Sequence, residues 1–301
     1  MGELLIGQTM SRVDRLLLRG EIFFIKRDDL IDPLLSGNKY RKLYSLIQAP
    51  AEQYKRLLSY GGTQSNAMLS IAALCHQKGW LFDYTSKTVP EHLKNRPTGN
   101  MKKALELGMR LHEVSHEDYE AAIVTLKSEA DDLTLFVPQG GADPIAHLGI
   151  EKLADEIKQW QQESGIKQLN VVTPSGTGTT AYYLATALPD VTVLTTPSVG
   201  DETYLISQME MLGKIPENLR ILVNSKKHYF AKPYAELLAM YNELNDAGIA
   251  FDLIYASLMW HTLLQHIDSI EGSTLYVHSG GLIGNATMLE RYRHKGLTAK
   301  A

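Results

Sequence analysis

The stretch LNVVTPSGTGTTAYYL, residues 169–184, decides the fold class, because its hydrophobic pattern changes from that of a strand to that of a helix. Its first part, Leu169–Thr173, is apolar and rich in valine, as in a buried strand, and its last part continues as a predicted helix to Ala187. The seven residues Pro174–Thr180 between them contain two glycines and four hydroxyl side chains. N–H groups and hydroxyls at a helix start favour a bound phosphate, although such a turn can also be purely structural.

The composition of this loop favours a phosphate monoester over a nucleoside triphosphate. The lysine of the motif G-x-x-x-x-G-K-[ST] is missing, and the glycine spacing does not fit a dinucleotide-binding fingerprint. A nucleotide-binding α/β protein is therefore the weaker interpretation of the loop.

Outward from this loop, short apolar runs alternate with longer helical patterns along most of the chain. Strands separated by helices are typical of a parallel sheet with helices on both faces, so we predict an α/β fold. The predicted strands are Ile22–Lys26, Arg56–Tyr60, Trp80–Thr85, Arg110–Val114, Thr134–Val137, Leu169–Thr173, Thr192–Thr195 and Thr274–His278. The predicted helices are Tyr40–Gln48, Ala67–Lys78, Gly99–Leu107, Ile145–Gln162, Thr180–Ala187, Tyr234–Asp246 and Leu258–Ser269. We predict a large domain of residues 1–51 plus 141–301 and a smaller α/β domain of residues 52–140, with ligands at the carboxyl ends of strands.

Three other segments place polar or basic side chains where a strand or loop meets a helix. Lys39 follows Ser-Gly-Asn at a predicted helix start, where the helix dipole lowers the pKa of an amine. Two interpretations of Lys39 remain open, namely a lysine that forms an imine and an ordinary surface lysine. Ser65 and Asn66 follow two glycines, either as a helix cap or as a site for a carboxylate. Ser279 precedes two glycines at the end of the strand Thr274–His278, where α/β sheets bind ligands.

Composition excludes several other classes of protein. The 301 residues carry a formal net charge of only -4, with lysine and arginine scattered along the chain, so we expect neither nucleic acid nor a membrane as partner. The single cysteine, Cys75, excludes an intrachain disulfide, and the ten histidines lack a metal-binding spacing, so no metal is expected. With no signal-peptide pattern and no long apolar run, we expect a cytoplasmic protein.

Taken together and in this order, the segments resemble the pyridoxal-phosphate (PLP) dependent family that contains 1-aminocyclopropane-1-carboxylate (ACC) deaminase and D-cysteine desulfhydrase. The resembling stretches also include Lys26–Leu30 and Pro138–Gly141, and they spread over nearly the whole chain. The resemblance implies the two-domain type II fold of PLP enzymes, which is the tryptophan-synthase-β type, and a homodimer. It further implies PLP as the cofactor and a small amino acid as the substrate.

The resemblance also assigns roles to single residues. Lys39 matches the lysine that holds PLP as a Schiff base and moves the substrate proton. Asn66 would lie against the PLP ring, and Ser65 matches a serine that meets the substrate carboxylate and is assigned a nucleophilic role in ACC deaminase. Tyr234 and Tyr255 match two active-site tyrosines. The cofactor phosphate would be bound by Thr177, Gly178, Thr179 and Thr180.

Two departures from the family pattern bear on the reaction. ACC deaminase has a glutamate after the second tyrosine, near the pyridine nitrogen of PLP, and this chain has Ala256 there. Ser279 is equivalent to the hydroxyl that desulfhydrases offer to that nitrogen, and a hydroxyl leaves the nitrogen less firmly protonated than a carboxylate does. We therefore expect α,β-elimination of D-cysteine-like substrates to a 2-oxo acid and ammonia, with ACC deamination as the alternative. A PLP-binding protein without turnover is a further alternative, because the residues around Tyr255 also differ from the family pattern.

Overall fold

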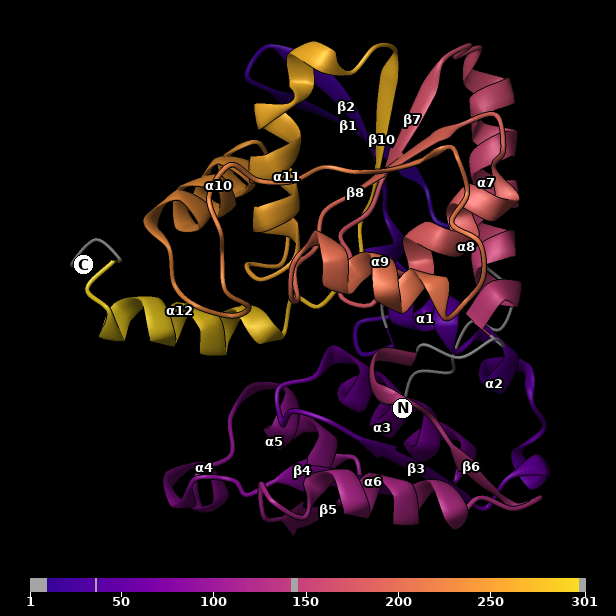
Figure 1. Cartoon of the computed structure of the whole chain (residues 1–301), viewed down its shortest axis with the longest axis vertical. Helices are drawn as coiled ribbons and strands as arrows, with labels where there is room; N and C mark the ends of the chain where they lie inside the picture. Colours follow the sequence, from indigo (N-terminus) through magenta and orange to yellow (C-terminus); the bar gives the residue numbers. More distant parts are fainter. Residues whose placement is uncertain (1–9, 36, 142–145, 298–301) are drawn as a thin grey trace. The chain divides into compact units, whose positions relative to one another are not determined.

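The computed structural model describes residues 10–35, 37–141 and 146–297 (Figure 1). The chain forms two compact units. Unit 1 comprises Met1–Arg41 with His147–Ala301, and unit 2 comprises Lys42–Ala146. Each unit combines a sheet with helices, so the α/β class predicted from the sequence is confirmed.

Unit 1 is built on a six-stranded sheet in the order β1-β2-β10-β7-β8-β9. Neighbouring strands are parallel except for β1 and β2, which form an antiparallel pair. The strands are β1 (Val13–Leu18), β2 (Glu21–Lys26), β7 (Leu169–Val172), β8 (Thr192–Thr195), β9 (Leu219–Ile221) and β10 (Ser273–Val277). The helices are α1 (Asn38–Lys42), α7 (Ala146–Ser164), α8 (Thr179–Ala187), α9 (Glu202–Glu210), α10 (Ala235–Asp246), α11 (Ala256–Gln265) and α12 (Gly284–His294).

Helices cover both faces of this sheet (Figure 1). On one face, α10 and α11 pack against the strands in an apolar core that includes Phe23 and Trp260, whose rings meet edge to face. On the other face, Trp160 of α7 meets Phe24 of β2 edge-on, with ring centroids 5.0 Å apart. Successive side chains of β2 therefore pack against helices on opposite faces of the sheet. Since both faces are covered, the middle of the strand is continuously apolar.

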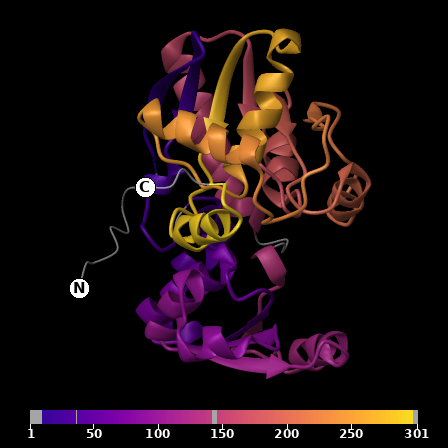
Figure 2. The ribbon, with the colours of Figure 1, turned by 90° about the vertical axis from the view of Figure 1, so that its left-hand side faces the viewer.

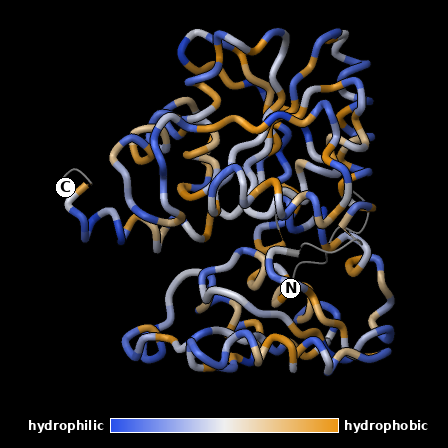
Figure 3. The backbone as a smooth tube through the Cα atoms, in the orientation of Figure 1, coloured by the Kyte–Doolittle hydropathy of each residue, from blue (hydrophilic) through white to orange (hydrophobic). Residues whose placement is uncertain are grey.

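The carboxyl ends of β2, β7, β8 and β10 lie at one edge of the sheet, because these strands are parallel. The loops that leave them lead into α1, α8, α9 and α12. Figures 1 and 2 both show α1 (indigo) and α12 (yellow) at this end of the sheet. In the tube coloured by hydropathy, orange segments run through the sheet of unit 1 and blue segments lie on its outer helices and loops (Figure 3).

Unit 2 has a four-stranded parallel sheet in the order β5-β4-β3-β6. Nine consecutive residues of α3, from Ala67 to Cys75, are buried, so this helix packs on all sides. The Cys75 thiol is part of this packing, and burial raises its pKa. The elements are β3 (Arg56–Tyr60), β4 (Leu81–Lys87), β5 (Met109–Val114), β6 (Thr134–Phe136), α2 (Tyr44–Gln48), α3 (Asn66–Lys78), α4 (Glu91–Asn95), α5 (Gly99–Glu106) and α6 (Tyr119–Ser128).

All eight predicted strands are confirmed within two residues at each end. The predicted helix Tyr40–Gln48 is wrong in being continuous, because the chain leaves the helical conformation at Leu43 and forms α1 and α2. The predicted helix Leu258–Ser269 starts two residues earlier, at Ala256, and ends at Gln265. The short strands β1 and β9 were not predicted, and α4, α6, α9 and α12 were also missed. In the three described ranges, no helix is long and apolar enough to cross a membrane.

Candidate active site

Lys39 lies in the first turn of α1, after the loop that follows β2. Its side chain is half-buried, and burial lowers the pKa of its amine from 10.5 to about 8. The lowered pKa that the sequence predicts is confirmed, but its cause is burial and not the dipole of a helix with only five residues. A neutral amine is the form that adds to a carbonyl group, so Lys39 is suited to bind an aldehyde. Ser36 of the same motif lies outside the described residues.

Gly37 brings the Lys39 loop against the turn that carries Ser279. Its φ of +60° lies in the left-handed region that favours glycine. A Cβ atom at this position would come within 2.5 Å of the Gly280 nitrogen and closer still to the Ser279 carbonyl group. Only a residue without a side chain permits this approach. The structure therefore unites two motifs that the sequence presents at opposite ends of the chain.

His278, which the sequence analysis assigned no role, fixes the conformation of the Ser279 turn. Its Nδ1 accepts a hydrogen bond from the Gly280 N–H at 3.1 Å, and its Nε2 donates to the Ala250 carbonyl at 2.8 Å. The ring is fully buried and stacks on Phe251, with centroids 4.4 Å apart. Burial lowers the pKa of His278, so the neutral imidazole with one donor and one acceptor is the form that the fold selects.

The loop of residues 174–180 has the donors that a phosphate needs. Gly178, with a φ of +77°, ends the loop, and α8 starts at Thr179 without a side-chain cap. The first N–H groups of a helix have no acceptor in the helix itself, so those of Thr179 and Thr180 are left for a ligand. The Thr180 hydroxyl is buried and has no hydrogen-bond partner among the described residues. The Thr177 and Thr179 hydroxyls lie 3.0 Å apart and share a hydrogen bond.

Tyr255 lies beside this loop, since a Cβ placed on Gly176 would be 3.7 Å from its ring. Its position is set by Asp252, another residue without a role in the sequence analysis. The buried Asp252 carboxylate accepts the N–H groups of Ile254, Tyr255 and Ala256 at 2.6–3.1 Å and so caps α11. Burial raises the pKa of Asp252 to about 6, and burial together with the charge of Asp252 raises the pKa of Tyr255. Tyr255 therefore keeps its proton at neutral pH.

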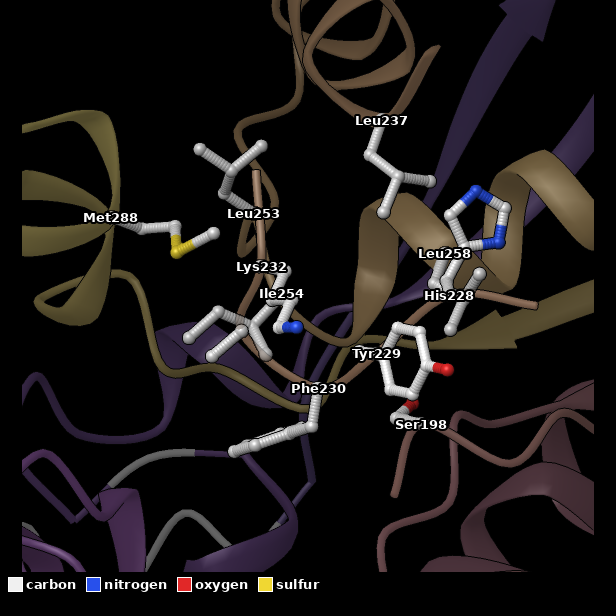
Figure 4. Close-up of a pocket in the computed structure, with 11 residues that line it drawn as sticks. Ser198, His228, Tyr229, Phe230, Lys232, Leu237, Leu253, Ile254, Leu258 and Met288 are labelled. Atoms are coloured by element: carbon white, nitrogen blue, oxygen red, sulfur yellow. The ribbon is translucent and has the colours of Figure 1, made fainter. Parts of the chain in front are cut away.

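Tyr234 makes its described contacts away from these residues. Its hydroxyl accepts the N–H of Tyr229 at 3.0 Å, and its ring meets His228 edge-on. The segment that precedes it lines a pocket with Ser198 and residues of α10 and α11 (Figure 4). Phe230 of that segment meets Tyr255 edge-on, with ring centroids 5.6 Å apart. In the described part of unit 1, Tyr234 is therefore linked to the site through this segment and not by direct contact.

Ser65 and Asn66 lie in unit 2 at the start of α3, after β3. The Ser65 hydroxyl oxygen accepts the Met68 N–H at 3.3 Å, so Ser65 is the helix cap that the sequence predicts. The Ser65 side chain also forms a hydrogen bond with the hydroxyl of Tyr84. The Asn66 side-chain oxygen accepts a hydrogen bond of 2.8 Å from Asn100. Asn100, which is fully buried and also donates to the Gln64 carbonyl, was missed because its partners lie 34 and 36 positions away.

Comparison with known proteins identifies the cofactor of this site. Residues 3–236, well over half of the chain, match the family described as pyridoxal-phosphate dependent enzyme. The chain belongs to this family. D-cysteine desulfhydrase of Serratia proteamaculans is 25% identical over 301 residues, which cover 91% of this chain and 90% of the relative. The bifunctional mitochondrial D-cysteine desulfhydrase and ACC deaminase of Arabidopsis thaliana is 26% identical over 298 residues, covering 89% of this chain and 74% of the relative.

A solved structure confirms the fold of this PLP-dependent enzyme. The crystal structure of an ACC deaminase homologue matches with a TM-score of 0.77 at 21% sequence identity, covering 96% of this chain and 95% of that chain. The predicted type II fold, with parallel sheets flanked by helices, is therefore confirmed, and so is the predicted cofactor.

The residues of unit 1 fit the two ends of PLP. At one end, the buried hydroxyl of Thr180 lacks a partner and the amides at the start of α8 are uncapped, as a phosphate group requires. At the other end, Lys39 provides an amine of lowered pKa for the aldehyde, in a loop that touches the Ser279 turn. Thr177–Thr180, Lys39 and Ser279 are thus the residues of unit 1 that would hold the cofactor.

Proposed function

We propose that the protein is a lyase that eliminates the β-substituent of small amino acids such as D-cysteine. The observation that carries this proposal is the Ser279 turn, whose backbone packs on Gly37 near Lys39 and which carries a hydroxyl residue and no carboxylate. Position 256 carries alanine, and the nearby Asp252 carboxylate is occupied by three N–H groups. A hydroxyl beside the pyridine nitrogen makes PLP a weaker electron sink. Such a cofactor suffices for α-proton loss and departure of a good leaving group, whereas opening a cyclopropane ring demands more.

The chain's own residues divide the work of this reaction. Bound PLP supplies a ring that takes up the negative charge left at the α-carbon when its proton is removed. The neutral amine of Lys39 accepts that proton, and its pKa of about 8 keeps a useful fraction neutral near pH 7. Tyr255, which stays protonated, donates a proton to the leaving sulfur. D-cysteine thus loses hydrogen sulfide, and the released 2-aminoacrylate takes up water to give pyruvate and ammonia.

Two residues of unit 2 complete the proposal on the strength of the family resemblance. Ser65 and the first N–H groups of α3 that its side chain does not cap would bind the substrate carboxylate. Asn66 is assigned to the PLP ring. A Ser65→Ala variant distinguishes the two roles of the serine, because loss of a carboxylate contact raises KM, whereas loss of a nucleophile lowers kcat.

ACC deamination is the second candidate, because the Arabidopsis thaliana relative is named for both activities. The deciding experiment measures pyruvate and sulfide released from D-cysteine beside 2-oxobutanoate released from ACC, with Lys39→Ala as the control. We expect sulfide to be the main product and the visible absorption of bound PLP to disappear in Lys39→Ala. Release of 2-oxobutanoate alone would assign the protein to ACC deamination. Bound PLP without turnover of either compound or of other D- and L-amino acids would favour a binding protein.

We also propose a cytoplasmic homodimer whose subunits each contain the large and small domains predicted from the sequence. The support for the dimer is the family resemblance. Light scattering of the purified protein tests the dimer, and cell fractionation tests the compartment. Limited proteolysis between the predicted domains tests their borders.

A further inference from the structure

Two residues after Lys39, the side chain of Arg41 is buried and binds two carboxylates at once. Its Nε and Nη2 donate to the two oxygens of Asp28 at 2.9 and 2.8 Å. Its Nη1 and Nη2 donate to the two oxygens of Glu156 at 2.6 and 2.9 Å. Only 1% of the Arg41 side chain is exposed, with 0% for Asp28 and 7% for Glu156. Four charge-assisted bonds in two forks fix the orientation of the guanidinium in all directions.

Lys26 and Ser11 close this network. The Lys26 amine lies 2.6 Å from Glu156 and donates to the Ser11 carbonyl, and the Ser11 hydroxyl donates to Asp28 at 2.6 Å. Two cations and two carboxylates leave the cluster without net charge. Although burial alone raises the pKa of Asp28, the charge and hydrogen bonds of Arg41 hold it below its usual range. Each charge is thus compensated, so removal of one partner would leave another buried and unpaired.

The network ties together the elements that surround α1. Lys26 ends β2, Asp28 starts the turn after it, and Glu156 lies in the middle of α7. Helix α1 has only five residues, too few to be stable by itself, so its position depends on such tertiary contacts. Two contacts, one on each side of Lys39, hold α1 in place. Before Lys39, the backbone of Gly37 packs on the Ser279–Gly280 peptide. After it, the side chain of Arg41 is bound in the network.

We propose that Arg41, Asp28 and Glu156 are positioning residues, which hold α1 so that the Lys39 amine meets the PLP aldehyde beside the Ser279 turn. The inference rests on the proposed role of Lys39. Replacement of a buried ion network by apolar side chains of similar volume is often neutral or stabilising. A fork of hydrogen bonds, however, specifies direction, which apolar packing does not. The forks of the network therefore give the placement of Lys39 a direction that apolar packing at the same site would not give.

The test compares variants by the rate at which the PLP-free protein captures PLP on Lys39. Arg41→Lys keeps the charge and loses both forks. The double variant Arg41→Met with Glu156→Leu removes one cation and one carboxylate, so the charges of Lys26 and Asp28 that remain still sum to zero. Capture is followed by the visible absorption and circular dichroism of bound PLP, and borohydride reduction with peptide mapping identifies the lysine. Because an error of about 1 Å in placement lowers a rate by as much as about 100-fold, we expect capture to slow at least tenfold in both variants.

Leu244→Ala is the matched control, because Leu244 is fully buried in the core of α10 and outside the network. If the placement of Lys39 does not depend on the overall stability of unit 1, Leu244→Ala lowers the melting temperature and leaves the capture rate unchanged. The proposal is overturned if the double variant, folded as judged by circular dichroism, captures PLP as fast as the wild type. It is also overturned if Leu244→Ala slows capture as much as Arg41→Lys does. A wild-type protein that binds PLP on another lysine would instead refute the proposed function.

Discussion

Replacing Gly37 with alanine perturbs the closest approach in the candidate site. The new Cβ would lie 2.5 Å from the Gly280 nitrogen, and ordinary van der Waals contact begins at 3.4 Å, so the two segments must separate by at least 0.9 Å (3.4 − 2.5). The φ of +60° adds about 1 kcal/mol of strain for a residue with a side chain. Because a displacement of about 1 Å at reacting groups can lower a rate about 100-fold, we expect a loss of roughly this size in turnover.

The assay measures sulfide release from D-cysteine at saturating PLP, together with the melting temperature. Gly165→Ala is the matched control, since Gly165 lies in unit 1 with a φ of +69° and has no neighbouring atom within 4 Å of an added Cβ. This control carries the same backbone strain without the clash, so it should lose stability and keep its turnover. A Gly37→Ala enzyme whose turnover stays within about threefold of the control would refute the close approach as a requirement of the site.

Three further predictions concern single side chains of unit 1. The rate at which the PLP-free protein captures PLP should rise with pH and level off above about 8, because the neutral amine of Lys39 reacts. Stopped-flow absorbance measures this rate, and a rate that keeps rising towards pH 10 would contradict the lowered pKa. Thr180→Val should weaken PLP binding about tenfold or more without lowering the melting temperature of the PLP-free protein. The reason is that the buried Thr180 hydroxyl has no partner among the described residues and therefore stabilises the protein only when a phosphate is bound. Equilibrium titration measures the affinity. Tyr255→Phe should lower kcat for D-cysteine about 100-fold. Tyr234→Phe should have a smaller effect, because the Tyr234 hydroxyl acts only through the segment whose Tyr229 N–H it accepts. Equal losses of kcat in both variants would argue against Tyr255 as the proton donor.

The α/β class and the positions of the strands could be predicted because they follow from local patterns. An apolar run followed by glycines and a helical period specifies a strand, a turn and a helix within about twenty residues. The helix cap at Ser65 is equally local, since its acceptor and donor lie three residues apart. The strand β1 was not predicted, because only Leu16 and Leu18 of its six residues are buried and the rest of its pattern is mixed.

The arrangement of the site could not be predicted in the same way, because its contacts join distant parts of the chain. Gly37 meets Ser279 only because β2 and β10 are neighbours in the sheet, and nothing near either residue specifies that pairing. The lowered pKa of Lys39 comes from burial, which a sequence does not show directly. In the same way, Arg41 resembles a surface residue until Glu156, 115 positions away, is placed beside it.

The Ser279 turn has a further consequence for how this scaffold changes in evolution or by design. The conformation of the turn is set by the His278 ring, by the Gly280 N–H and by the backbone of Gly37. None of these described contacts uses the side chain of Ser279. In the proposed site, position 279 can thus be exchanged without rebuilding its surroundings, whereas its neighbours can change only together. A library confined to position 279 would therefore vary the side chain that we propose to face the cofactor, while the backbone of the turn stays the same.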